Sequence, residues 1–560
     1  MKTDKADEST RDIICFDFRF GLRSYEEEMK HLKEMRKKAE NEEDTEVRAA
    51  KLKTIEDLEA RVTSRKDLYR KLSKADLRRI IYEEGIDITY DHLDKKSGEV
   101  VVDEVIHYKM LYRSPAKAKQ GLVMLIREEL YDIAYEWITM GIGARLPAHG
   151  AKIVEISAYA PLTTSTIEGT MNIPIDDVLL VKDQESFFRT IADIVRAEDY
   201  QVYETKYSGK KKVSVPVTKK KCVVNREETD VKNVMWDGMA LIETGILPDW
   251  CNGMALLRNH FFKACAFRTH IQQFFRDYCA EHGLDYETFT VKDMFGGEHL
   301  AKNIKMIVSD NGPKIWKFAD LIGGDKKSAY EYWKERVEAD GCVWGIVKTD
   351  HPSKLGEVQQ LSYQIQNSLP VTEEEVYKIA ETSVKYVESL KNDDTEFVKY
   401  LRKNANLVNS YDMFADLYEW NPGIGNSKFF RFNKSKIINE YITKLKKGKI
   451  TTAGDNLTVC GNPYALLLYC VSEDWTKDPT LQPEEGVIQC FTKRFEDGEF
   501  LCGIRSPQNS ANNIGYFHNV RHPLMEKYFD FSNNIMAVNC IHTDVQPRMN
   551  GEDSNNQGWF

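Results

Sequence analysis

The stretch NGMALLRNHFFKACAFRTH, residues 252–270, decides the fold of the middle of the chain. Its apolar residues form short runs that do not alternate cleanly with polar ones. Similar runs, separated by Gly and Pro, recur across residues 231–350. A strand with one face in water alternates, whereas a strand that is buried on both faces does not. The sequence therefore predicts a small closed β-barrel in this region.

Four cations interrupt this apolar stretch, namely Arg258, His260, Lys263 and Arg268. A buried cation is costly unless it meets an anion, which is either a carboxylate of the protein or an anionic ligand. The stretch is therefore a candidate site for phosphate contacts, and internal pairing is the alternative.

Helix-forming residues dominate the segment 24–80 on the N-terminal side. Charges of both signs recur there at i,i+3 and i,i+4 spacing, and apolar residues are sparse. This pattern predicts a helical hairpin or short coiled coil with a break near Asn41–Thr45. A solvated arm is the simplest interpretation, and self-association through residues 24–80 is an alternative.

Strand and helix patterns alternate further along the chain. They predict strands over 98–114, a helix over 120–142, a strand over 151–162, a helix over 185–198 and two or three strands over 200–229. The segment 351–450 is predicted to be mainly helical, with a capping box at Thr372 and Glu375, and strands return from residue 451.

These patterns predict an α+β multidomain protein in which two β-rich regions flank a helical one. The expected divisions are 1–85 with the helical hairpin, 86–200 as an α+β domain, 201–350 as the first β-rich domain, 351–450 as a helical connector and 451–560 as the second β-rich domain.

Composition narrows the class of protein. The 560 residues carry a net charge of −10 with 42% hydrophobic residues, as in a globular protein with a sizeable core. Eleven cysteines occur singly, without a CxxC pair, so neither a zinc site nor a disulfide framework is indicated. The polar start and the lack of a long apolar run predict a cytoplasmic protein without a membrane span.

Lysine is concentrated in the segment YSGKKKVSVPVTKKKC, residues 207–222. Two lysine triplets bracket VSVPVT, so that a hairpin would present both on one edge, where the phosphate backbone of a nucleic acid is an apt partner. A solubilising loop is the alternative. The candidate residues are Lys210, Lys211, Lys212, Lys219, Lys220 and Lys221.

The segment RMNGEDSNNQGWF, residues 548–560, has polar side chains at alternate positions after Gly551. Alternating carboxylates in a turn can aim several oxygens at one hard cation, as two-metal phosphoryl transfer requires. Here these positions read Asp553, Asn555 and Gln557, so only one is a carboxylate.

In order along the chain, GDNLTVCGNPYALLL, RSPQNSANNIGYFHNVRHP, NNIMAVN and RMNGEDS resemble the catalytic stretch of two-barrel RNA polymerases. That family includes cellular RNA polymerase large subunits, RNA-silencing polymerases and single-chain phage polymerases. The chain is also similar to large proteins of gut Clostridia and their mobile elements. The resemblance implies two double-psi β-barrels, Mg²⁺ as cofactor, and nucleic acid and nucleoside triphosphates as partners.

The resemblance also implies roles for particular residues. Arg505 matches the arginine of the family's Arg-x-Pro segment and would face the nucleotide, while Asn550 and Asp553 match the start of the metal-binding loop. Lys263 is the best candidate for the basic residue of the first barrel, with Arg258, His260, Lys314 and Lys317 as further candidates for phosphate contacts.

The chain departs from the family at the metal-binding loop, because Asn555 and Gln557 stand where the family has carboxylates. Two fewer charges weaken magnesium binding severely. We therefore expect an RNA polymerase-like nucleotidyltransferase that is incomplete or inactive as this chain. The alternative is a non-catalytic nucleic-acid-binding protein of phage or mobile-element origin.

Overall fold

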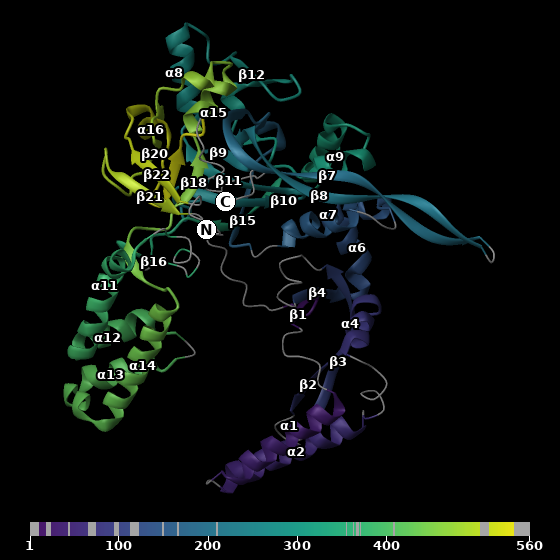
Figure 1. The fold of residues 1–560 in the computed structure, drawn as a ribbon, viewed down its shortest axis with the longest axis vertical. Coiled ribbons are helices and arrows are strands. Elements are labelled where there is room, and N and C mark those ends of the chain that lie inside the picture. The colour runs from purple at the N-terminus through teal and green to yellow at the C-terminus, as the bar shows by residue number, and fades with distance from the viewer. Residues whose placement is uncertain are drawn as a thin grey trace. The chain divides into compact units, whose positions relative to one another are not determined.

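The computed structural model describes most of the chain. The described residues are 10–17, 24–42, 45–64, 66, 74–93, 100–112, 122–147, 151–164, 167–208, 211–353, 356–361, 363, 365, 369, 371–406, 409–504 and 514–541. Within them the fold is mixed α+β (Figure 1). The chain divides into two compact units, which are Met1–Ile175 with Arg258–Lys263 and Pro313–Val347, and Asp176–Leu257 with Ala264–Gly312 and Lys348–Phe560.

The first unit contains the predicted helical hairpin, which is confirmed as α1 (Tyr25–Glu40) and α2 (Thr45–Ser64). A capping box of Ser24 and Glu27 starts α1, and the break falls where the charge pattern placed it. Arg36 of α1 pairs with Glu59 of α2 at 2.8 Å, which joins the two helices.

The first unit also contains a four-stranded antiparallel sheet, whose first strand, β1 (Ile13–Asp17), precedes the hairpin in sequence. The strand order is β1-β4-β3-β2. Buried Ile81, Tyr108 and Leu125 form part of its core. The elements of this part are β1 (Ile13–Asp17), α4 (Lys74–Glu83), β2 (Ile86–Leu93), β3 (Val100–Tyr112), β4 (Leu122–Arg127) and α6 (Glu128–Thr139).

The strand predicted over 151–162 is wrong, because these residues form α7 (Ala151–Tyr159) and the 3-10 helix η3 (Ala160–Thr164). Ile156 and Ala160 are buried, whereas Ala158, which a strand would place on the same face, is exposed. The hydroxyl of Ser157 also donates to the carbonyl of Ile153 within the helix.

The helix predicted over 185–198 is also wrong. These residues begin β7 (Glu185–Ser208), which pairs with β8 (Lys211–Val234) in an antiparallel two-stranded ribbon. Each residue of β7 gains a partner on β8, such as Val224 for Val195. A short segment of sequence does not reveal a partner strand that is distant in the chain, and tertiary pairing overrides a local helical pattern. The strands expected over 200–229 are confirmed as parts of this ribbon.

A seven-stranded mixed sheet has the order β5-β15-β10-β11-β9-β14-β6. Its strands are β5 (Gly169–Asn172), β6 (Val178–Val181), β9 (Met239–Glu243), β10 (Met254–Asn259), β11 (Phe262–Thr269), β14 (Met306–Ser309) and β15 (Val343–Thr349). The opening stretch, 252–270, thus contributes the hairpin β10–β11, and its strands are largely buried, as expected.

A second mixed sheet contains β18 (Thr458–Gly461), β19 (Pro483–Glu484), β20 (Val487–Phe491), β21 (Phe500–Ile504), β22 (Ile514–Asn519) and β23 (Ile535–Val538). Its main path is β21-β22-β20-β23-β18, with pairings that are antiparallel, parallel, antiparallel and parallel.

Five strands of the first sheet repeat this path as β10-β11-β9-β14-β6. Two residues join β10 to β11, which requires an antiparallel pair. The next three pairings are parallel, antiparallel and parallel. The strands also follow in the same sequence order, and a helix precedes the last strand in both sheets, α8 (Ile271–His282) and α16 (Pro523–Tyr528). The two sheets therefore share one topology.

One hydrophobic core, which belongs to the second unit, contains residues from both sheets, among them Leu241, Phe267, Phe491 and Val538. The backbones also come close, because a Cβ added to Gly461 would lie 2.0 Å from the carbonyl oxygen of Met235. Only glycine allows this approach between the segment after β8 and strand β18.

A helical region with its own core lies between the two sheets in sequence, as predicted. Its helices are α11 (Glu373–Asn392), α12 (Asp394–Asn404), α13 (Tyr411–Trp420) and α14 (Lys428–Lys446), and the predicted capping box of Thr372 and Glu375 is confirmed. Remaining elements are α9 (Lys326–Ala339), α15 (Pro463–Cys470), β12 (Thr290–Lys292), β13 (Glu298–Leu300), β16 (Val358–Gln360) and β17 (Thr451–Ala453).

Candidate nucleic-acid interface

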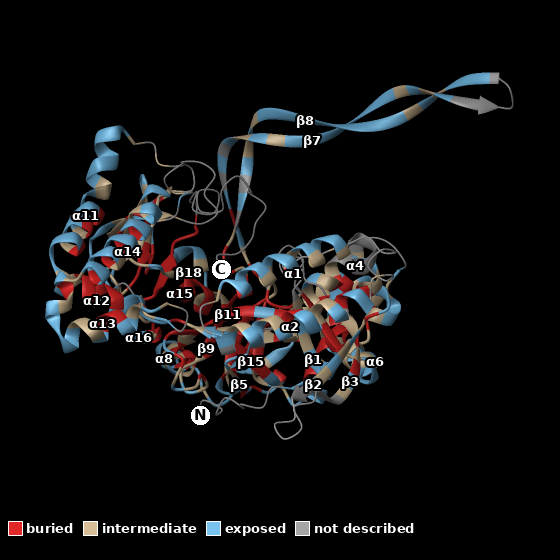
Figure 2. Ribbon diagram, turned by 90° about the horizontal axis from the view of Figure 1, so that it is seen from below, coloured by how far each residue is buried: buried red, intermediate tan, exposed pale blue. Residues whose placement is uncertain are grey.

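The ribbon β7–β8, which is mostly exposed (Figure 2), carries the predicted lysine clusters. The expected hairpin exists, because β7 pairs with β8 as far as Ser208 and Lys211, and VSVPVT is part of strand β8. Lys211, Lys212, Lys219, Lys220 and Lys221 therefore follow one another along one strand, while Lys210 lies outside the described residues.

Carboxylates of β7 accompany the second lysine triplet. Lys219 pairs with Glu204 at 2.8 Å, and the hydrogen bond to Glu204 raises the pKa of Lys219. Lys221 and Lys220 approach Glu198 and Asp199 at 3.6 and 4.0 Å. Consecutive strand residues point to opposite faces, so the triplet is divided between both faces of the ribbon. Exposed pairs of this kind are weak and can exchange a carboxylate for a phosphate.

The root of the ribbon is held by a buried carboxylate that sequence analysis missed. Asp183 accepts the backbone N–H groups of Gln184 and Trp236, at 2.7 and 3.0 Å, and thus joins the entry and the exit of the ribbon. The side-chain amide of Asn311 donates to its second oxygen at 2.7 Å. Burial raises the pKa of Asp183 to about 7. The only sequence signal was an aspartate two positions after the apolar run VLLV.

A second buried polar network begins at Trp236. Its indole Nε1 donates to the carbonyl oxygen of Asn462 at 2.9 Å, and the Asn462 side chain bonds to Asp478. Thr480 donates to the same carboxylate from its hydroxyl and its backbone N–H. Burial raises the pKa of Asp478. The end of the ribbon is thereby fixed to the second sheet by hydrogen bonds as well as by apolar packing.

Within the stretch 252–270, Arg268 has an internal role. Its guanidinium donates to the carbonyl oxygens of Thr244, Cys251 and Asn252 at 2.7 to 2.8 Å, which fixes the loop before β10. The sequence predicted a carboxylate or an anionic ligand as the partner of this cation, whereas the structure provides backbone carbonyl oxygens. Arg258 is half-buried on β10.

His260 is buried in the first unit, where its Nε2 bonds to Asp340. The indole of Trp137 donates to the same carboxylate at 2.8 Å and packs edge-on against the imidazole. Burial lowers the pKa of His260 although Asp340 acts in the opposite direction. These contacts describe an internal polar cluster, and contact of His260 with a nucleic acid stays a prediction.

The lysines expected in the first barrel lie at or near the surface of the first unit. Lys263 is exposed on β11, between buried Phe262 and Ala264. Phe262 forms a β-bridge with Pro313, which places Lys314 on the neighbouring segment. Lys317 is exposed and lies 3.8 Å from Glu155. The structure therefore brings the segments of Lys263 and Lys314 together.

The predicted metal-binding and nucleotide-facing residues, Arg505, Asn550 and Asp553, lie outside the described residues. In the part that the structure describes, no group of three or more His, Cys, Asp or Glu side chains is arranged to hold a metal ion. No helix in that part is long and apolar enough to cross a membrane.

Comparison with known proteins adds no identification. No protein-family model matches the chain, and no curated protein matches it in sequence.

Proposed function

We propose that the chain is a nucleotidyltransferase-like protein of the two-barrel RNA polymerase class. The observation that supports this most is the pair of sheets with one strand order, one set of pairing directions and a shared core. A family built on two related barrels needs such a duplication, and we assign the two sheets to its two double-psi barrels. The motifs that resemble the family surround strands β18, β22 and β23, all in the second sheet.

In this proposal Asp553 and Asn550 hold Mg²⁺ weakly, Arg505 faces the nucleotide and Lys263 contacts phosphate. A complete metal loop would position two magnesium ions for in-line phosphoryl transfer. Amides at Asn555 and Gln557 supply oxygen ligands without charge. We therefore expect little or no incorporation of nucleotides by this chain.

The test measures template-dependent incorporation of nucleoside monophosphates and Mg²⁺ binding by the unaltered chain and two double variants. N555D/Q557D restores the alternating carboxylates, and S554D/N556D adds the same charge at the positions between them. We expect Mg²⁺ binding and incorporation to increase in the first variant only. Efficient incorporation by the unaltered chain contradicts the expected inactivity, and equal behaviour of the two variants contradicts the assigned metal loop.

A second candidate function is non-catalytic binding of nucleic acid, which the lysine-rich strand β8 favours. Exposed aromatic Tyr203 lies on the same ribbon, where bases can stack. We expect affinity for nucleic acid to fall steeply with salt, and neutralising Lys219–Lys221 to glutamine to reduce that slope. Neutralising Lys326 and Lys327, which begin α9, serves as the control. An affinity that does not depend on salt rejects this function.

A further inference from the structure

The two faces of the ribbon β7–β8 differ in exposure. Antiparallel neighbours point to the same face, so one face carries the odd residues of β7 and the even residues of β8. We call each cross-strand pair of residues a row. On this face, every residue is exposed from the row Phe187–Lys232 to the row Asp199–Lys220. We call this section the ribbon face. The opposite face contains the half-buried Ala192, Ile194 and Val223.

Large apolar side chains lie uncovered on the ribbon face. Phe187, Ile191, Val195 and Val224 are exposed to 54, 63, 65 and 60%. An isolated two-stranded ribbon is only marginally stable in water, because it has no third strand or helix against which to bury such side chains. Yet the root of this ribbon is fixed by Asp183 and by the buried hydroxyl of Ser186, which donates to the carbonyl of Cys540. A firmly anchored, uncovered face is typical of an interaction surface.

The charges on the ribbon face identify the kind of partner. Four cations, Arg189, Lys220, Arg226 and Lys232, balance four anions, Asp193, Asp199, Glu228 and Asp230, so the net charge is zero. A surface for nucleic acid requires an excess of cations, which this face lacks. The face therefore fits a neutral partner with alternating charges.

We propose that the ribbon face binds the ribbon face of a second copy of this chain, about a two-fold axis parallel to the strands. Such an axis places β7 of one copy over β8 of the other, with each row facing itself. Arg189 then faces Asp230 of the second copy, Asp193 faces Arg226, and Val195 faces Val224. Three of the four cations, Arg189, Lys220 and Arg226, thus face an anion, and the apolar row Val195–Val224 faces itself. In the rows Phe187–Lys232 and Ile191–Glu228, a charged side chain faces an apolar one. Each contact occurs twice, as an isologous interface requires.

The size of the ribbon face sets the expected strength of this interface. Thirteen residues of each strand extend about 43 Å and present a face about 10 Å wide, or about 430 Å² per copy. Standard stable interfaces bury about 800 Å² on each side, so we expect a weak dimer. Two twisted ribbons pack face to face in the aligned arrangement of β-sandwiches. The inference does not depend on the proposed catalytic function.

Sedimentation velocity of the full chain over a range of micromolar concentrations tests the proposal. We expect a dimer, and we expect V195E to weaken dimerisation at least about 100-fold, because two carboxylates lose water without gaining a cation. The matched control is N225E, which places the same charge on the opposite face of β8, where Asn225 is exposed. It should leave the dimer unchanged.

Three results would overturn the proposal. The unaltered chain could be a monomer throughout the concentration range. V195E could remain as dimeric as N225E, which would assign the contact to another surface such as the helical arm. Association could also appear only after addition of duplex RNA, which would make nucleic acid and not the second ribbon the partner.

Discussion

The buried carboxyl group of Asp183 makes the stability of the protein depend on pH. Burial raises its pKa to about 7, against about 3.9 for an aspartate in an unfolded chain. The folded state therefore holds the proton more tightly, and the contribution of this group to the free energy of unfolding decreases as pH rises from about 4 to about 7. Above this window the contribution is constant.

We expect D183N to remove this pH dependence. The amide oxygen can still accept the N–H groups of Gln184 and Trp236, while the buried charge is lost. The free energy of unfolding of the original protein relative to D183N should fall by up to about 4 kcal/mol between pH 4 and 8. Hydrogen-exchange protection of the amides at the ribbon root, followed over this pH range, measures the difference. D193N, which changes an exposed aspartate of the ribbon, is the control. Parallel pH profiles for the original protein and D183N contradict the expectation.

Single residues were only partly predictable from the sequence. The cost of cations in an apolar stretch correctly indicated that Arg268 and His260 need partners. The partners themselves, three backbone carbonyls and Asp340, lie on segments that only the tertiary fold brings near. Asp183 escaped notice because its importance depends on Trp236, which is 53 positions away.

Elements were predictable where the determinants are local. The helices α1 and α11 begin at capping boxes, whose two residues are three positions apart. The first half of β7 was wrongly predicted to be a helix. Its residues form a strand because they pair with β8, from Glu185 with Val234 onward. Local patterns therefore identified strands only where β-branched residues were dense.

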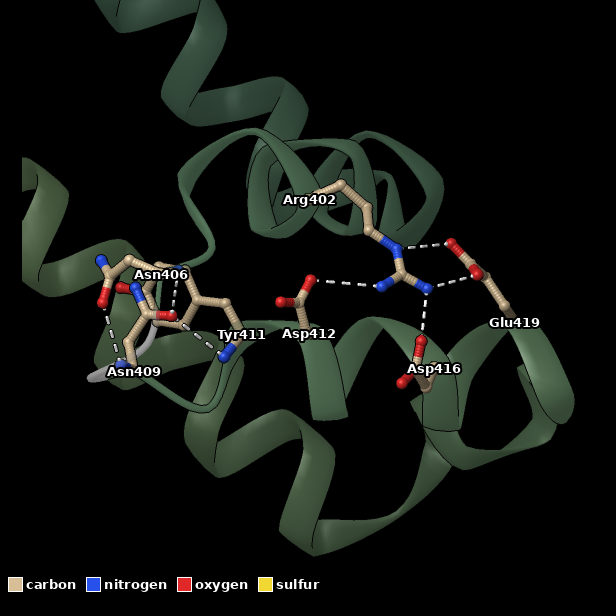
Figure 3. A network of polar contacts seen from close by, with 7 residues as sticks. All are labelled: Arg402, Asn406, Asn409, Tyr411, Asp412, Asp416 and Glu419. Atoms are coloured by element: carbon tan, nitrogen blue, oxygen red, sulfur yellow. Dashed lines mark hydrogen bonds and ion pairs between the residues drawn. The ribbon is translucent and has the colours of Figure 1, made fainter. Parts of the chain in front are cut away.

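The link between α12 and α13 offers a prediction for a helical pair. Arg402 of α12 bonds to Asp412, Asp416 and Glu419 of α13 (Figure 3). These groups are exposed, so each pair contributes little. We expect R402A to lower the stability of the helical region slightly in low salt, because three carboxylates lose their shared cation, and by less at high salt.

Hydrogen exchange in α12 and α13 measures this effect. K399A is a suitable control, since Lys399 pairs with Glu396, which lies in the same helix, α12. Equal loss of protection in R402A and K399A would show that the network does not hold the two helices together.

At the scale of the whole molecule, the residue patterns predicted two β-rich regions around a helical one, while a common topology was implied only by the family resemblance and not by the patterns. The corresponding strands share no sequence repeat that reveals the duplication, as Met306–Ser309 and Ile535–Val538 illustrate. Strand order depends on which edges pair, and the pairing of β14 with β6 and β9 joins segments far apart in the chain. A local pattern contains no information about such pairs.

We expect the shared core to couple the stability of the two sheets, and this can be tested with matched leucine substitutions. Leu467 is fully buried in the core that both sheets share, and Leu390 is fully buried in the separate core of the helical region. Each Leu→Ala change should cost about 2–5 kcal/mol through lost contacts and a cavity. In L467A we expect faster hydrogen exchange in both sheets, whereas L390A should affect only α11 to α14. If L467A loosens the second sheet alone, the sheets are independent domains, and the close approach of Gly461 to Met235 does not couple their stability.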